Sequence, residues 1–204
     1  KFLGTAAIYG AALDGLTITF NLDAHLELIG ASALAGNNVT QLSLPTVKHI
    51  GAGAFANNTK MTQITFHPNS TFSSVGPYAF ASCTKLGAIS IPNNVTTIGE
   101  YAFDKCTSLA SVSFGEGSKL QAIGGYAFNG NSTLKNFTMP ENVDTVLDYA
   151  FEKCTALTTV TLSKRLATIN ARVFGTSPIS NIDVPEGNPY LKDIDGVVYD
   201  IAET

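Results

Sequence analysis

Short runs of alternating apolar and small polar residues recur along the chain. The runs V-S-F, I-S-I, F-T-M, V-T-L and I-D-V place an apolar residue at every second position. Such alternation is typical of a strand with one buried face. A proline often closes the run because it cannot donate to the backbone ladder, as at Pro45, Pro92, Pro140 and Pro185. No stretch shows a sustained helical period, so the pattern predicts short parallel strands and few or no long helices.

These strands belong to a longer repeat. Equivalent aliphatic positions stand at residues 29, 50, 75, 98, 123, 146 and 169, which gives about seven copies of 21 to 25 residues. The variation in length falls between the last strand residue and the next buried aliphatic residue. Phe114 to Leu120 spans six positions, whereas Ile91 to Val95 spans four. Insertions confined to one point of a repeat mark a surface turn.

A single copy is too short to bury its own apolar residues, so neighbouring copies must share one core, as in a solenoid. The strands of successive coils would then form one parallel sheet. We divide the solenoid into a degenerate N-terminal repeat or cap at 1–28, seven repeats at 29–186, and a C-terminal element at 187–204. The last element contains Asp195-Gly196, a hairpin turn signal, and is either a hairpin-like cap or the start of a further repeat.

Composition narrows the possible functions. The net charge is −4, so there is no basic surplus for a nucleic-acid backbone. The longest charge-free stretch, Leu28 to Val47, is interrupted by polar residues and proline, which argues against membrane insertion. No catalytic fingerprint and no metal-ligand spacing occur, and the three cysteines lack a C-x-x-C pair. We therefore predict no catalytic residues, no metal site and no cofactor.

The motif A-F-x-x-C-x-x-L-x-x-I-x-I-P, followed by V-x-x-I-G, resembles the BspA-like leucine-rich repeats. It stands most completely at Ala79 to Pro92 with Val95, Ile98 and Gly99. The resemblance covers about 29–199 and implies a leucine-rich-repeat solenoid, an α/β horseshoe-like class that is mostly β here, with short 3₁₀ turns. The first and last repeats depart from the motif, for example with Ala33-Leu34 in place of Ala-Phe, as expected for coils that cap a solenoid.

The same resemblance implies a function. Members of the family are exported surface proteins that act in adhesion to host proteins or to other cells. It therefore implies an extracellular or cell-surface location, a removed signal peptide, and a bacterial rather than a protist source. The expected partner is a protein or a glycan. A passive spacer that displays another domain is the alternative function, and an enzyme ranks last. Exposed sheet ends also allow end-to-end self-association.

The outward strand positions are the first candidate binding site. They form two small, polar and nearly uncharged rows, for which a solvated face is the simpler interpretation and a shallow binding surface the functional one. Strand spacing gives this face roughly 330 Å², well below the roughly 800 Å² of a standard interface. The rows contain Gln41, Ser43, Gln63, Thr65, Ser90, Ser111, Ser113, Asn136, Thr138, Thr159, Thr161, Asn181 and Asp183.

Two further rows follow from the repeat. Tyr78, Tyr101, Tyr126 and Tyr149 occupy one slot and predict an aromatic edge, which either packs on itself or offers a contact strip. A second slot exchanges cysteine with asparagine and serine, which indicates a small buried side chain bonded to turn backbone. We expect free thiols in this structural ladder, although adjacent coils bring the first two close enough for a disulfide. The ladder contains Cys83, Cys106, Cys154, Asn58 and Asn131.

Overall fold

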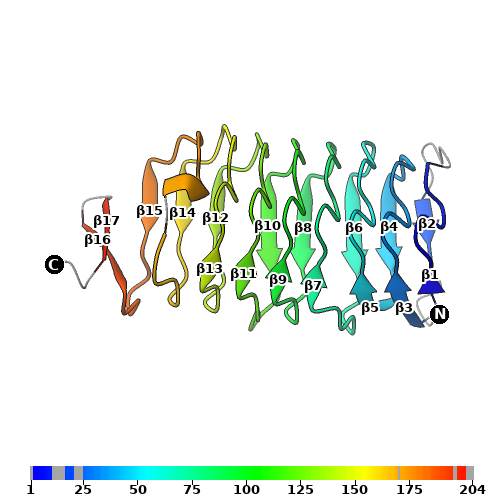
Figure 1. Cartoon of the computed structure of the whole chain (residues 1–204), viewed down its shortest axis with the longest axis horizontal. Coiled ribbons are helices and arrows are strands. Elements are labelled where there is room, and N and C mark those ends of the chain that lie inside the picture. Colours follow the sequence, from blue (N-terminus) through cyan, green and yellow to red (C-terminus); the bar gives the residue numbers. More distant parts are fainter. Residues whose placement is uncertain (1, 11–16, 21–24, 170, 195–196, 201–204) are drawn as a thin grey trace.

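The chain folds into a solenoid of about seven turns. The computed structural model describes residues 2–10, 17–20, 25–169, 171–194 and 197–200. The coils stack side by side along the long axis, from the N-terminal end to the C-terminal end (Figure 1). The only helical element among the described residues is the 3₁₀ segment η1, Ala171–Val173. The predicted fold class, a parallel-sheet solenoid with almost no helix, is confirmed.

The predicted alternating runs form the strands of the first side of the solenoid. Each strand pairs in parallel with the equivalent strand one coil away, so Ser111 lies opposite Ala88 and Phe114 opposite Ile91. Inward positions of these strands are apolar and outward positions are small and polar, because one face covers the core and the other meets solvent. The strands are β2 (Thr17–Thr19), β4 (Gln41–Leu44), β6 (Gln63–Phe66), β8 (Ala88–Ile91), β10 (Ser111–Phe114), β12 (Asn136–Thr138), β14 (Thr159–Thr161) and β15 (Asn181–Asp183).

A second side of the solenoid is also built from parallel strands, which the sequence analysis did not predict. It had treated residues such as Ile98 only as buried aliphatic positions after a turn. In the structure Ile98 pairs with Val75 on one side and with Ile123 on the other. These strands are β1 (Phe2–Leu3), β3 (His25–Ile29), β5 (Thr46–Ile50), β7 (Ser74–Val75), β9 (Thr97–Ile98), β11 (Ala122–Ile123) and β13 (Thr145–Val146).

Glycine follows the second strand in several coils because adjacent backbones approach closely there. A Cβ atom added at Gly99 would lie 2.7 Å from the backbone nitrogen of Pro77, and one added at Gly124 would lie 2.7 Å from that of Glu100. Real Cβ atoms do not tolerate such contacts without displacing the backbone. Glycine permits this close approach and accounts for the aliphatic-Gly pair in several coils, although Leu147 occupies the same position one coil after Gly124.

The third side is a run of turns that contains the Tyr-Ala-Phe segment. Backbone hydrogen bonds join it to the next coil: Tyr78 donates to the carbonyl of Glu100 at 3.0 Å, and Phe80 donates to that of Ala102 at 2.8 Å. Two residues per coil adopt left-handed conformations, as Tyr78 (φ 56°) and Ser82 (φ 60°) do. The left-handed residues reverse the chain locally, so that alternate backbone groups face the neighbouring coil and find partners there.

A column of phenylalanine rings fills the centre of the solenoid. Their centroids lie 5.0 to 5.3 Å apart from Phe55 through Phe151, and the planes of neighbouring rings differ by 15° or less. Every ring in this Phe ladder is fully buried. From the second coil onward the repeat places a phenylalanine at this position, and the stacking of coils then determines the ring spacing. The Phe ladder consists of Phe55, Phe80, Phe103, Phe128 and Phe151, with Phe174 in looser contact at its end.

The C-terminal region departs from the parallel arrangement. β16 (Leu191–Ile194) pairs antiparallel with β17 (Val197–Asp200). The predicted turn residues Asp195-Gly196 lie outside the described residues. Just before the hairpin, the Asn188 side chain donates to the carbonyls of Ser163 and Leu166, each at 3.1 Å. The buried Asn188 amide therefore joins this region to the last coils, while the division of the chain at 28 and 186 remains a prediction.

Candidate functional site

The outward rows on the first side of the solenoid lie where the repeat register predicts. Gln41 pairs with Gln63, and the hydroxyl of Thr65 donates to that of Ser43 at 3.0 Å. Farther along, Asn136, Thr159 and Asn181 are directly opposite one another, as are Thr138, Thr161 and Asp183. The remaining members of the rows are Ser90, Ser111 and Ser113 on β8 and β10. The structure thus brings the predicted residues onto one side of the solenoid.

This face is not one continuous sheet. Among the described strands, no pairing joins β6 to β8 or β10 to β12. Each break follows a 25-residue coil and precedes a 23-residue coil. The extra residues of the longer coil lengthen the loop after its strand, so the two strand ends leave the sheet along different paths. The predicted flat face is therefore divided into three short sheets.

A cleft of about 400 Å³ lies at the second break, between β10 and β12. Phe114 and Val112 line it and are only partly buried, whereas the equivalent residues of β8 are buried. The loop at 115–118 forms one wall and the turn at 140–142 the other. The side chain of Asn142 donates to the carbonyl of Ser118 at 2.8 Å and so ties the two walls together. The cleft combines an apolar floor with polar walls.

A similar cleft of about 340 Å³ lies at the first break, between β6 and β8. Phe66, His67 and Pro68 line one side, and Pro92 and Asn93 line the other. The His67 ring nitrogen Nδ1 accepts a hydrogen bond from the backbone of Asn69 at 3.1 Å, which fixes the loop that carries the ring. Both clefts therefore have the same origin, a long coil stacked against a short one.

The sequence predicted four residues that line these clefts, namely Thr65, Ser90, Ser113 and Thr138 of the outward rows, but not the clefts themselves. The sequence pattern identified Phe114 only as the last residue of a strand and the insertion after it only as a surface turn. The alternation of 25-residue and 23-residue coils was visible in the sequence and was the signal that could have located the breaks. The cleft itself was not predictable from that signal, because it depends on how two loops of unequal length pass each other.

The four predicted tyrosines form a stacked Tyr ladder along one edge. Ring centroids are 4.9 Å apart between Tyr78 and Tyr101, 4.8 Å between Tyr101 and Tyr126, and 5.0 Å between Tyr126 and Tyr149. The planes differ by 6°, 1° and 17°, respectively. All four residues adopt left-handed φ values of 54° to 62°. Stacking and the backbone of the third side hold them there, since this conformation is unfavourable for a residue with a Cβ atom.

The surroundings of Tyr101, the second residue of the Tyr ladder, make its hydroxyl harder to ionise. Loss of hydration raises the pKa of the Tyr101 hydroxyl above its ordinary value. The neighbouring hydroxyls of Tyr126 and Tyr78 act in the same direction, as do the carboxylates Glu100 and Asp104. A stacked row of phenols resists the accumulation of like charge. The Tyr101 hydroxyl therefore stays uncharged at physiological pH.

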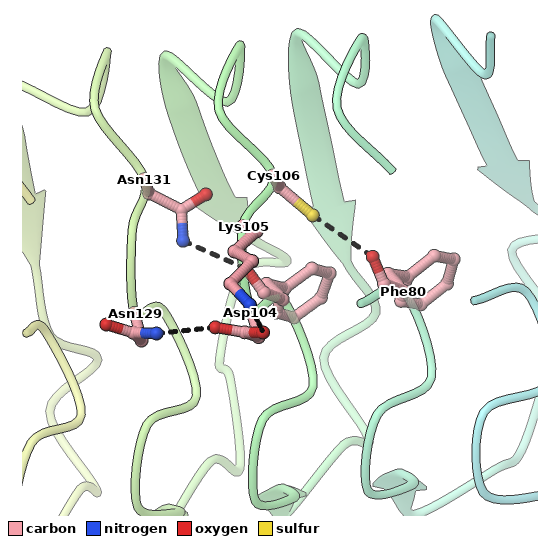
Figure 2. Close-up of polar contacts among 7 residues, drawn as sticks. Phe80, Asp104, Lys105, Cys106, Asn129 and Asn131 are labelled. Carbon is pink, nitrogen blue, oxygen red and sulfur yellow. Dashed lines mark hydrogen bonds and ion pairs between the residues drawn. The ribbon is translucent and has the colours of Figure 1, made fainter. Parts of the chain in front are cut away.

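The Cys/Asn slot forms the third row, and its side chains bond to the backbone of the preceding coil. The thiol of Cys106 donates to the carbonyl of Phe80 at 3.1 Å (Figure 2). The amide of Asn131 donates to the carbonyl of Phe103 at 2.9 Å. Cys83 and Cys154 make the same contact, with the carbonyls of Phe55 and Phe128. Each coil thus satisfies a carbonyl of the coil before it.

Asparagine makes more contacts in this slot than cysteine does. The Asn58 amide donates to the carbonyls of Leu34 and Phe55, and its oxygen accepts from the backbone of Asn37 and Val39. Asn131 also donates twice, but its buried oxygen has no hydrogen-bond partner among the described residues. The slot therefore accepts several side chains, provided that each supplies one donor.

The three thiols are free and buried. Burial raises the pKa of Cys83 and Cys154 to about 12 and raises that of Cys106 well above the ordinary value. Such thiols stay protonated at neutral pH and do not act as nucleophiles or metal ligands. The role of these thiols is therefore to pack between neighbouring coils.

A polar pair lies on the third side, next to this row. The Asn129 amide donates to the carboxylate of Asp104 at 2.6 Å, one coil away, and the ammonium of Lys105 lies 3.8 Å from the other carboxylate oxygen (Figure 2). Asp104 is largely buried, so these contacts offset the loss of its hydration. The pair stabilises the stacking of the two coils at the base of the Tyr ladder.

Clusters of metal-ligating side chains and long apolar helices are absent from the part of the chain that the structure describes. No group of three or more histidine, cysteine, aspartate or glutamate residues there could hold a metal ion. Within the same residues, no helix has the length and apolar character needed to span a bilayer. Among the features available for recognition are the broken strand face with its two clefts and the Tyr ladder.

Comparison with known proteins places this architecture in a family. The BspA-type leucine-rich repeat region matches residues 15–86 and 73–194, in six copies. The chain belongs to the BspA-type leucine-rich repeat family. The predicted resemblance is thereby confirmed. No curated protein matches the chain.

Solved bacterial structures share the fold of this family member. A leucine-rich repeat protein of T. pallidum matches with a TM-score of 0.60 and 26% identity, over 66% of this chain and 63% of its own. A leucine-rich cell surface protein of Faecalibacterium prausnitzii matches with a TM-score of 0.57 and 21% identity, over 91% and 64%. The pneumococcal vaccine antigen PcpA matches with a TM-score of 0.65 and 22% identity, over 95% and 46%. The chain thus spans less than two thirds of the length of each of these proteins.

Proposed function

We propose that this protein is a non-enzymatic cell-surface or secreted scaffold that mediates adhesion by binding a protein through the first sheet. The observation that carries the proposal is the pair of clefts at 64–68 and 112–118, which open on the predicted binding face. Binding energy at protein interfaces concentrates where an apolar side chain fills a desolvated pocket within a polar surround. The clefts supply such pockets on a face that is otherwise small and polar.

The clefts also answer the objection that the strand face is too small. A flat face of roughly 330 Å² lies below the roughly 800 Å² that a standard interface buries per partner. The loops after β6 and β10 widen the contact area beyond the strands, and the clefts add depth. An array with more coils would enlarge the face further, as would display in many copies.

The comparisons support a surface location for the proposed scaffold. One similar protein is described as a cell surface protein and another as a vaccine antigen. Bacterial relatives also favour a bacterial source, with export to the surface or the medium. The same reasoning keeps the predicted end-to-end self-association as part of the proposal, because β15 is the terminal strand of the first sheet in the described residues.

Binding to immobilised extracellular-matrix proteins tests the proposal. The chain is measured alone and as the double variant Ser113→Arg, Thr138→Arg, which places two long charged side chains beside the larger cleft. The control is Thr145→Arg, an exposed residue of β13 on the other sheet. Saturable binding that the double variant weakens about tenfold or more and the control leaves unchanged would support the strand face.

Two results would contradict the proposal. Equal weakening by Thr145→Arg would show that the strand face is not the site. An absence of saturable binding at high protein concentration, with this chain and with a longer array, would favour the passive spacer. Light scattering over a range of concentrations tests self-association separately, and a monomer throughout would remove that part.

A further inference from the structure

The Tyr ladder stops abruptly at its N-terminal end. Tyr101 and Tyr126 stack on a tyrosine at each face, but Tyr78 stacks on Tyr101 alone among the described residues. The preceding coils carry Gly53 and Ser32 in the tyrosine slot. Their φ values, 61° and 52°, lie close to those of the tyrosines, so the backbone continues the ladder while the rings do not. Tyr78 consequently keeps 47% of its surface exposed.

An open hollow of about 490 Å³ occupies the place where the next ring would stand. Its floor consists of the small residues of the preceding coils, whose alanine methyl groups and glycine leave room above them. Tyr78 forms one end wall. Polar groups surround the hollow on the third side of the solenoid. The lining consists of Ala31, Ser32, Ala52, Gly53, Ala56, Asn57, Tyr78, Ala81, Ser82 and Asp104.

We propose that this hollow binds one pyranose ring of a neutral glycan, stacked on the free face of Tyr78 at the position of the missing rung. The tyrosine rings repeat every 4.8 to 5.0 Å, so the hollow has room for one flat ring at that spacing. The inference concerns a different edge from the strand face and does not depend on the proposed function.

The polar groups of the lining favour a sugar over an aromatic side chain. A pyranose has an apolar C–H face, which packs against an aromatic ring, and a rim of hydroxyls that need partners. The hydroxyls of Ser32 and Ser82, the amide of Asn57 and the carboxylate of Asp104 line the same hollow and can serve as those partners. An aromatic side chain would use the ring face and leave these polar groups without new partners.

Charge separates a neutral glycan from an anionic ligand. The one ionised group that lines the hollow is the carboxylate of Asp104. The nearby ammonium of Lys105 lies 3.8 Å from this carboxylate and is partly neutralised by it. A phosphate or a sialic acid would therefore meet negative charge rather than a cationic clamp. A neutral hexose or N-acetylhexosamine meets no such repulsion.

Nuclear magnetic resonance of the full chain with labelled tyrosine tests the proposal. The chain has 7 tyrosines and no tryptophan, so the Tyr78 ring signal can be assigned by substitution. The probes are methyl glycopyranosides of glucose, galactose and N-acetylglucosamine, with p-cresol as a mimic of an aromatic side chain. We expect one of the sugars to shift the Tyr78 signal saturably, with a millimolar Kd, and to leave Tyr149 unshifted.

Three variants make the test specific. Gly53→Tyr places a ring in the missing rung. A Cβ atom there would lie 3.4 Å from the Ser32 hydroxyl oxygen, and Gly53 already has the left-handed φ that the ladder tyrosines adopt. Tyr78→Leu removes the aromatic platform. Tyr149→Leu is the matched control, since it removes a ring from the far end of the same ladder. Sugar affinity should fall about tenfold or more in the first two variants and stay unchanged in the control.

Several results would overturn the proposal. One is the absence of a saturable shift with every sugar. Another is an unchanged sugar affinity in a folded Tyr78→Leu chain, which stays informative even if Gly53→Tyr does not fold. Saturable binding of p-cresol without binding of any sugar would replace the glycan with an aromatic protein side chain. Failure of the strand-face variants to affect matrix binding would leave this result untouched, so the two proposals fail separately.

Discussion

Two aromatic ladders run along the same solenoid at nearly the same spacing. Neighbouring rings are 5.0 to 5.3 Å apart from Phe55 to Phe151, and 4.8 to 5.0 Å apart from Tyr78 to Tyr149. The stacking of coils determines both spacings. The Phe ladder is fully buried and has Phe174 in looser contact at its end, whereas the Tyr ladder lies at the surface and covers four coils. Stacking geometry is therefore common to both rows, and burial decides how much each contributes to stability.

The largest expected effect is in the Phe ladder. Phe103→Ala should lower the free energy of unfolding by about 3–5 kcal/mol, because it leaves a cavity between two other fully buried rings. Urea unfolding followed by circular dichroism measures the change. Phe103→Leu is the control and should cost clearly less, since it refills most of the volume. An alanine effect no larger than that of Tyr101→Ala would contradict the contrast between the ladders.

The next effect is in the Cys/Asn slot, beside the Phe ladder. Asn131→Ala removes two hydrogen bonds to buried carbonyls and should cost about 1–3 kcal/mol. Asn131→Cys restores one donor, as in the neighbouring coils, and removes the amide oxygen that has no partner in the described residues. It should therefore recover most of the loss. Equal losses in the alanine and cysteine variants would show that the slot is filled for volume alone.

Alkaline pH should destabilise the fold through the same slot. The pKa of Cys83 is about 12 in the folded chain, against an ordinary value of 9.0 that applies when the chain is unfolded. Between these values the unfolded state holds fewer protons than the folded state, so the free energy of unfolding falls as pH rises above 9.0. At pH 10 the loss is about 1 kcal/mol for Cys83. Below pH 9.0 the contribution is fully present.

Urea unfolding at neutral pH and at pH 10 checks this prediction, with Cys83→Ser as the comparison. Serine occupies the equivalent slot at Ser177 and donates to the carbonyl of Phe151. The variant should lose less stability on going to alkaline pH, while the tyrosines affect both proteins equally. Identical losses in the two proteins would show that Cys83 does not titrate differently in the folded and unfolded chains.

The smallest expected effect is in the Tyr ladder. Tyr101→Ala removes the stacking on both neighbours and should cost about 1 kcal/mol. Tyr101→Gly removes the same ring but relieves the left-handed strain at φ 54°, which is worth about 1 kcal/mol for a residue with a Cβ atom. In thermal unfolding, the melting temperature of Tyr101→Gly should therefore be higher than that of Tyr101→Ala. The opposite order would mean that the backbone of the third side does not impose this conformation.

The repeat made much of the architecture predictable. Seven starting positions in register required stacked coils, because no copy could bury residues such as Phe103 and Leu109 alone. Residues that recur at the same position of successive repeats also predicted the Tyr ladder and the contacts of Cys106 and Asn131 with turn backbone. The second sheet was missed because its strands are only two residues long in most coils, as in β9, which is too short for an alternating pattern.

The candidate sites also differ in how far the sequence predicts them. The outward strand rows could be written from the alternation of β8 and β10, but the clefts beside them could not. A cleft forms where loops of unequal length separate neighbouring strands, and no residue in either loop encodes that separation by itself. The hollow beside Tyr78 arises similarly, since Gly53 belongs to one coil and Tyr78 to the next.

The sequence alone determined which residues are equivalent, because a repeated pattern assigns each residue a slot and a coil. It thereby determined the solenoid, the outward rows and the row of tyrosines. Only the tertiary structure decided what happens between coils of different length or composition: where the first sheet breaks, which face of Tyr78 is open, and which polar groups surround it. The physical reason is that a slot is a local property of one coil, whereas a cavity depends on contacts between atoms of several coils.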